Sequence, residues 1–66
     1  MRLIRIGHAA KMLGVDPDTL RRRTNGDWAD VDGHRIQAYP MDFRAGAERR
    51  YDVDETDQLL ERLRDR

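Results

Sequence analysis

Two short helical segments separated by a tight turn constrain the fold of this chain more than any other feature of its sequence. Apolar residues recur at positions i, i+3, i+4 and i+7 of the first segment: Ile6, Ala9, Ala10 and Leu13. This spacing predicts a helix over residues 7–13 with one buried face. Gly14 is expected to end this helix, because glycine readily adopts the left-handed conformation.

The second segment begins directly after the turn and carries three consecutive arginines. Asp16 offers an N-cap oxygen and Pro17 a preset φ, so a second helix is predicted from residue 17 to about residue 24. Leu20 is its one strong apolar anchor, and the arginines at 21–23 crowd its exposed side. Two short helices over about residues 6–24 are typical of a helix-turn-helix unit.

The stretch from residue 27 to residue 50 lacks a helical period and is expected to form β-structure. Asp32 and Gly33 have the composition of a two-residue hairpin turn. Alternating residues at 35–43 and a returning strand at 48–51 predict a wing-like β-hairpin within about residues 28–51. Pro40 places the first of these strands at a sheet edge or beside a bulge, because proline cannot donate to a central ladder.

Three single residues have alternative interpretations. Trp28 is the sole tryptophan and is expected to plug the edge of the core, with base stacking as the alternative. Ile4 either forms a short strand or packs beneath the helices. His8 is expected on the outer surface of the first helix, where a contact to phosphate is the alternative.

A C-terminal helix is predicted over about residues 53–65. Asp52 and Glu55 have the spacing of a capping box, in which each residue caps the other's backbone. The side chains that repeat at helical spacing are Thr56, Leu59, Leu60 and Leu63. We therefore expect one α+β domain over residues 1–66: a small winged helix-turn-helix with two N-terminal helices, a β-hairpin wing and a C-terminal helix.

The composition argues against several functional classes. The chain has no cysteine and two histidines, which are too few for a disulfide or a structural zinc site, so no metal and no cofactor are expected. A domain of this size buries about 60% of its unfolded surface, which leaves little room for a catalytic cleft. We therefore expect neither an enzyme nor a small-molecule ligand. Charged residues interrupt the apolar N-terminus, so we expect no export signal, no membrane contact and a cytoplasmic location.

The formal net charge is zero, but the charges are segregated along the chain. Residues 1–15 hold three basic residues and no acid, whereas six acids and three arginines lie in residues 52–66. Twelve of the thirteen basic residues are arginine. The planar guanidinium suits phosphate oxygens and guanine edges, so the bias favours nucleic-acid binding, with genome composition as the alternative explanation.

Seven side chains are the candidate DNA contacts. They are Thr19, Arg21, Arg22 and Arg23 of the second helix, Arg44 near the wing tip, and Arg49 and Arg50 on the returning strand. Arg22 is the first choice for reading a base. Successive helical residues point about 100° apart, so at least one of the three helix arginines is expected to contact phosphate or pair with Asp18 or Asp27.

Alternatives stay open for each candidate. The Thr19 hydroxyl contacts DNA or bonds to its own helix backbone. The arginines at 21–23 form either a DNA-binding surface or a plain solvated charge run. Each wing arginine contacts phosphate or forms a surface salt bridge with Asp42 or Glu48.

One set of residues resembles a family motif. The set comprises Ile6-Gly7, Ala10, Leu13-Gly14-Val15, Pro17 and Thr19-Leu20-Arg21, followed by Arg49-Arg50-Tyr51 and the capped acidic helix. From Ile4 to about Leu63 the chain resembles the winged helix-turn-helix domain of the MerR superfamily. In size it is similar to the small phage and mobile-element excisionases and to BldC-like regulators. The resemblance implies double-stranded DNA as partner, with the second helix in the major groove and the wing against the backbone or minor groove.

The resemblance further implies an excisionase-like architectural protein. Such a factor binds attachment-site DNA side by side with its copies, bends the DNA and directs an integrase toward excision. A MerR-like or BldC-like transcriptional regulator that binds an operator is the first alternative, and a domain of a longer regulator would have the same sequence. The second alternative is a protein-interaction module that docks through Leu59, Leu60 and Leu63.

Overall fold

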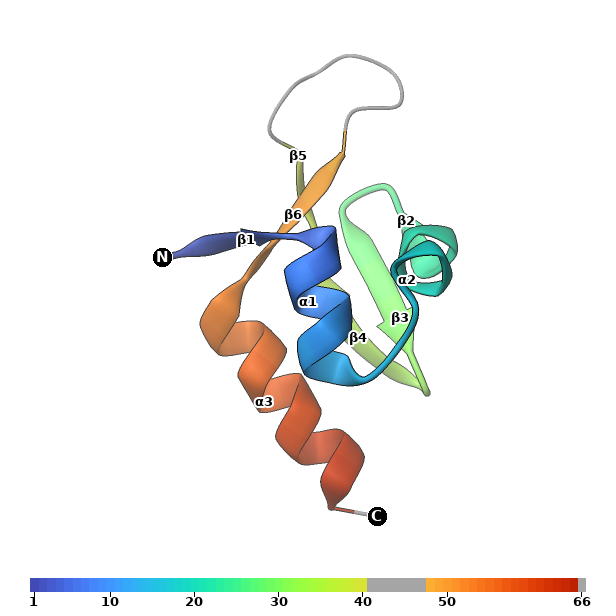
Figure 1. The fold of residues 1–66 in the computed structure, drawn as a ribbon, viewed down its shortest axis with the longest axis vertical. Helices are drawn as coiled ribbons and strands as arrows, with labels where there is room; N and C mark the ends of the chain where they lie inside the picture. The colour runs from blue at the N-terminus through green and yellow to red at the C-terminus, as the bar shows by residue number, and fades with distance from the viewer. Residues whose placement is uncertain (41–47, 66) are drawn as a thin grey trace.

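A strand at the N-terminus pairs with a strand from the C-terminal third of the chain, and the helices pack around this link. The computed structural model describes residues 1–40 and 48–65. The elements in chain order are β1 (Leu3–Arg5), α1 (Ile6–Leu13), α2 (Pro17–Arg23), β2 (Thr24–Asn25), β3 (Trp28–Val31), β4 (His34–Gln37), β5 (Tyr39–Pro40), β6 (Arg49–Asp52) and α3 (Val53–Arg64) (Figure 1). Within the described residues the fold is α+β, with three helices and two small antiparallel sheets.

The first sheet has the strand order β1-β6-β5 and joins the two ends of the chain. Ile4 of β1 lies opposite Tyr51 of β6, and both side chains are buried. The backbone N–H of Val53 donates to the carbonyl of Arg2 at 2.9 Å, which continues the pairing into the start of α3. Of the two alternatives for Ile4, the structure shows the short strand.

The second sheet has the order β2-β3-β4 and follows α2 directly. Its β3–β4 hairpin turns at Asp32 and Gly33, whose φ angles are 50° and 84°. Positive φ at both central residues is the signature of the tight hairpin turn that the sequence predicted there. Ala29, Val31 and Ile36 point from this sheet into the core.

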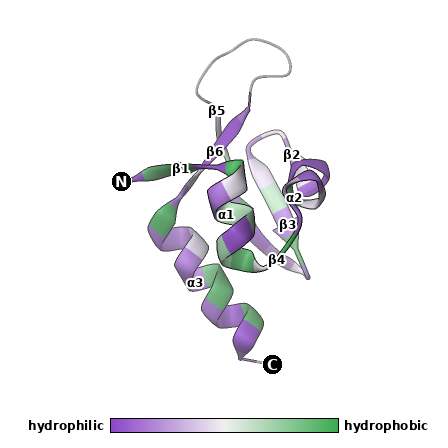
Figure 2. Ribbon diagram, in the orientation of Figure 1, coloured by the Kyte–Doolittle hydropathy of each residue, from purple (hydrophilic) through white to green (hydrophobic). Residues whose placement is uncertain are grey.

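Helix α1 lies at the centre of the molecule, with α3 on one side and α2 and the second sheet on the other (Figure 1). All four residues of its predicted apolar stripe are buried. Hydrophobic and hydrophilic residues interleave along α3, whereas α2 is mostly hydrophilic (Figure 2). Among the described residues, no helix has the length and apolar character needed to cross a membrane.

Asp52 caps α3 as predicted, with its Oδ2 accepting the backbone N–H of Glu55 at 3.1 Å. The reciprocal half of the predicted capping box differs. The Glu55 carboxylate accepts the hydroxyl of Tyr39 at 3.1 Å. The other carboxylate oxygen of Asp52 accepts the backbone N–H of Arg2 at 3.3 Å, so this one side chain caps α3 and holds the N-terminal strand.

The prediction of a single wing hairpin over residues 28–51 is wrong. The described strands of this stretch form two pairs, β3–β4 and β5–β6, that belong to different sheets. The chain crosses between the sheets at Ala38, which is buried and donates its backbone N–H to the carbonyl of Asp27 at 2.6 Å. Pro40 lies in β5, at the edge of its sheet, as its missing N–H predicted. The expected loop at residues 44–47, with Arg44, lies outside the described residues.

The prediction that Trp28 plugs the core is also wrong. Side chains alternate along β3, so Ala29 and Val31 point inward while Trp28 and Asp30 point outward. Trp28 is 45% exposed. The small Ala29 fills the inward position and is fully buried.

Candidate nucleic-acid interface

The turn between α1 and α2 is closed by backbone hydrogen bonds rather than by side-chain packing alone. Gly14 has φ 72° and ψ 27°, the left-handed conformation that ends a helix. The N–H of Val15 donates to the carbonyl of Ala10 at 3.0 Å. Asp16 then accepts the N–H of Asp18 at 2.8 Å as the N-cap of α2, with Pro17 in the first helical position. The three residues 14–16 therefore fix the direction in which α2 leaves α1.

Helix α2 buries one side chain and exposes its charged ones. Leu20 is fully buried, whereas all three arginines of the helix are exposed. Arg22 follows Leu20 by two positions, about 200° around the helix, so of the three arginines it points most directly away from the core. Arg21 pairs with Asp18 one turn earlier, at 2.5 Å between Nη1 and Oδ1. This ion pair is one of the outcomes that the sequence predicted for an arginine of this helix.

Arg22 and Arg23 have no ion-pair partner within residues 1–40 and 48–65. Their guanidinium groups are therefore solvated and available to an anionic ligand. Thr19 is half-buried on the flank of α2. The structure thus places the four predicted residues of this helix around its exposed surface, with Arg22 at the centre.

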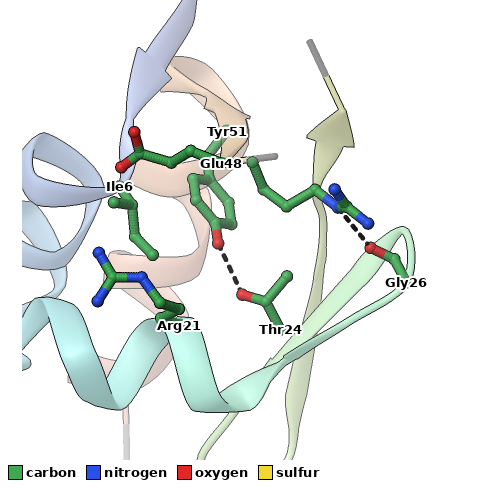
Figure 3. A pocket seen from close by; sticks show the side chains of 7 residues that line it. Ile6, Arg21, Thr24, Gly26, Glu48 and Tyr51 are labelled. Atoms are coloured by element: carbon green, nitrogen blue, oxygen red, sulfur yellow. Dashed lines mark hydrogen bonds between the residues drawn. The ribbon is translucent and has the colours of Figure 1, made fainter. Parts of the chain in front are cut away.

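A hollow of about 500 Å³ separates α2 from β6 (Figure 3). The residues that line it are Ile6, Arg21, Thr24, Gly26, Glu48, Arg49 and Tyr51. Its floor is apolar, because Ile6 and the Tyr51 ring belong to the core. Its rim carries the guanidinium groups of Arg21 and Arg49 and one carboxylate, that of Glu48.

A chain of hydroxyl groups joins β6 to the last turn of α2 along this hollow. The hydroxyl of Thr24 donates to the carbonyl of Leu20 at 2.8 Å. It lies 2.6 Å from the hydroxyl of Tyr51 (Figure 3). Because Thr24 has a single hydroxyl proton and gives it to Leu20, Tyr51 is the donor in the second bond.

The surroundings of Tyr51 keep its hydroxyl protonated. The side chain is buried, and this burial raises the pKa of the Tyr51 hydroxyl above its ordinary value of 10.0. The charges of Arg49 and Arg21 act in the opposite direction with smaller effect. The hydroxyl is thus a neutral donor at physiological pH, as the bond to Thr24 requires.

The two described arginines of the predicted wing do not lie together. Arg49 points toward the hollow, and its Nε donates to the carbonyl of Gly26 at 2.9 Å. Arg50 is the next residue of β6 and points to the other face of the sheet, where Arg5 and Tyr39 are its strand partners. Arg49 therefore shares the hollow with Arg21 of α2, whereas Arg50 faces Arg5 across the ladder.

Comparison of the chain with models of protein families, with curated proteins and with solved structures finds no match. The MerR-like resemblance therefore stays a prediction from the motif residues. Within the described residues, histidine and acidic side chains form no cluster of three or more that could hold a metal ion.

Sequence reasoning missed the Thr24–Tyr51 pair. Thr24 stands at the expected end of the second helix, and Tyr51 appears in the motif without an assigned role. The two residues are separated by 27 positions. The available signal was chemical: a tyrosine beside core-facing residues needs a partner for its hydroxyl.

Proposed function

We propose that this protein binds double-stranded DNA as a winged helix-turn-helix, with α2 as the recognition helix. The observation that carries the proposal is the position of Arg22, solvated and opposite the buried Leu20 on a short helix held at both ends. The turn at 14–16 fixes the N-terminal end of α2, and the Tyr51–Thr24–Leu20 chain fixes its C-terminal end. Because both ends of α2 are held, its backbone does not have to be ordered when the Arg22 side chain reaches a base edge in the major groove.

The hollow between α2 and β6 suits a backbone phosphate beside the recognition helix. Arg21 and Arg49 approach it from two different elements, and the Arg49 guanidinium is anchored by Gly26. On binding, Arg21 exchanges the exposed carboxylate of Asp18 for a phosphate oxygen, a trade of one surface ion pair for another. Contacts of this type set the orientation of the helix, while Arg22 reads the sequence.

Within DNA binding, the motif resemblance favours an excisionase-like architectural role over a transcriptional regulator. Gel-shift and bending assays on candidate attachment-site DNA separate the two. Stepwise complexes with increasing bend support the architectural role, whereas a single complex on unbent DNA supports a regulator that binds an operator.

The structure weakens the alternative of a docking module built on α3. Leu59 is 2% exposed, and Leu60 and Leu63 are partly buried against the chain's own core. The predicted leucine stripe is therefore used within the molecule.

The proposal is tested by the salt dependence of binding to a fluorescent duplex. If Arg21, Arg23 and Arg49 each contact a phosphate, the log–log slope is about −3, at about −0.9 per phosphate. Arg22→Ala removes a base contact and lowers discrimination between specific and random duplexes by about 1 to 3 kcal/mol. Arg64→Ala, which removes an equally exposed arginine from α3, is the matched control and leaves affinity unchanged. A slope near zero contradicts the proposal.

A further inference from the structure

The outer face of the second sheet is a second exposed surface, and an aromatic side chain lies at its centre. Side chains that point outward from β2, β3 and β4 form what we call the Trp28 platform: Asn25, Trp28, Asp30, Arg35 and Gln37. Trp28 stands on the middle strand of the three. Apart from Met1, it is the one large hydrophobic side chain left exposed among the described residues.

The platform is ordered by cross-strand neighbours. Trp28 lies between Asn25 of β2 and Gln37 of β4 in the pairing register, with an amide side chain on each side. The guanidinium carbon of Arg35 is 5.7 Å from the centroid of the Trp28 ring, a cation–π distance. Arg35 also pairs with Asp30, its partner in the register, at 3.4 Å between Nε and Oδ1.

The sequence that carries the platform is acidic, whereas the sequence up to the end of α2 is basic. Residues 25–37 carry three carboxylates, at Asp27, Asp30 and Asp32, and one guanidinium. Residues 1–24 carry six basic residues and two acids. An acidic surrounding repels a phosphate backbone and attracts a cationic partner, so the platform is unsuited to nucleic acid even though it exposes an aromatic ring.

We propose that the Trp28 platform docks an arginine- or lysine-rich segment of another protein. The ring already accepts one guanidinium, which shows that a planar cation fits over it. The exposed carboxylates of Asp27 and Asp30 supply the opposite charge, with Asp30 exchanging its surface pair to Arg35 for the incoming cation. The amides of Asn25 and Gln37 can hydrogen-bond to the backbone of an extended segment. Tryptophan and arginine are also the side chains most enriched at the energetic centres of protein interfaces.

This inference does not rest on DNA binding, because none of the α2 arginines belongs to the platform. Trp28→Ala is expected to weaken peptide binding and leave duplex binding unchanged. Arg22→Ala is expected to do the reverse. The failure of one proposal is therefore distinguishable from the failure of the other.

Trp28 is the only tryptophan in the chain, so its fluorescence reports on the platform alone. The full chain is titrated with a capped peptide of alternating arginine and glycine, with a matched peptide of glutamine and glycine, and with oligothymidine. The arginine peptide is expected to change the emission saturably, and the glutamine peptide is expected to have no effect.

A variant with both Asp27→Asn and Asp30→Asn is expected to bind the arginine peptide about three- to tenfold more weakly, because each exposed charge pair contributes modestly. Asp57→Asn on α3 is the matched control and leaves binding unchanged. Circular dichroism of each variant checks that the fold is retained. A response to oligothymidine alone, equal responses to the two peptides, or no response to any ligand overturns the proposal.

Discussion

The hydroxyl of Thr24 joins the last turn of α2 to β6. It donates to the carbonyl of Leu20 in the last turn of the helix and accepts the hydroxyl of Tyr51. The backbone N–H of Thr24 bonds to the carbonyl of Arg21, so the Leu20 carbonyl accepts from the Thr24 side chain in place of the Thr24 backbone. One threonine therefore ends the helix and sets its distance from the strand.

Removing the two hydroxyls is expected to have graded effects on the free energy of unfolding. Tyr51→Phe loses one hydrogen bond and costs about 1 kcal/mol. Thr24→Val leaves the buried Tyr51 hydroxyl without an acceptor and costs about 2 to 3 kcal/mol. Thr19→Val, on the flank of the same helix, is the control and stays within about 0.5 kcal/mol. Equal stability of Thr24→Val and Thr19→Val in urea unfolding would show that the chain of hydroxyls is unimportant.

The raised pKa of Tyr51 makes stability depend on alkaline pH. The folded-state pKa lies above the ordinary value of 10.0, so its contribution is fully present below about pH 10 and is lost as pH rises through the folded pKa. Tyr39, whose pKa is raised by desolvation and by Glu55, acts in the same direction. The unfolding free energy, measured by urea titration at several pH values, should fall less steeply above pH 10 in Tyr51→Phe than in the wild type. Identical slopes would contradict the assignment.

Among single residues, the sequence predicts the roles of those that act on backbone nearby in the chain. Gly14, Asp16 and, in its cap of α3, Asp52 act on backbone within a few positions, and local sequence identified these roles. The bond from Asp52 to the backbone of Arg2 spans 50 positions and was not predicted. Trp28 and the Thr24–Tyr51 pair depend on strand register and on contacts between distant segments, which a local pattern does not contain.

At the scale of elements, the turn between α1 and α2 depends on one backbone conformation. Gly14 has a positive φ, and a Cβ added there meets nothing within 4 Å, so the cost of a substitution is conformational. Gly14→Ala is expected to destabilise the protein by about 1 kcal/mol.

Gly7 provides the matched control. It lies in the first turn of α1, where a Cβ also meets nothing within 4 Å, and its φ is not in the positive region. Gly7→Ala is expected to stabilise the protein by about 0.5 to 1 kcal/mol through helix propensity. If thermal unfolding shows the same sign for both substitutions, the left-handed turn does not hold α2 in place.

The helices were predictable as elements and the sheets were not. Helices α1 and α3 have an apolar stripe of period 3.6, and α2 has an N-cap, a proline in its first turn and one apolar anchor. The boundaries of all three therefore fall within one residue of expectation. The alternating run at 35–43 looked like one strand. In the structure, residues 35–37 belong to β4 of the second sheet and residues 39–40 to β5 of the first. The buried Ala38 lies between the two strands.

At the scale of the whole molecule, zero net charge conceals two surfaces of opposite sign. The arginines of α2, with Arg49 across the hollow, form one cationic region, whereas acids dominate the exposed face of α3 and the hairpin from 25 to 37. A protein with this distribution can orient on a polyanion without being basic overall, because local potential decides the approach.

Mapping of backbone amides by NMR during titration with a short duplex at low salt tests the central claim most directly. If α2 is the recognition helix, the largest shifts are expected in residues 19–24 and at Arg49, around α2 and the hollow, with Asp54 and Asp57 of α3 unaffected. Shifts concentrated on α3 or on the Trp28 platform, or no shifts at any amide, would contradict a DNA-binding role for α2.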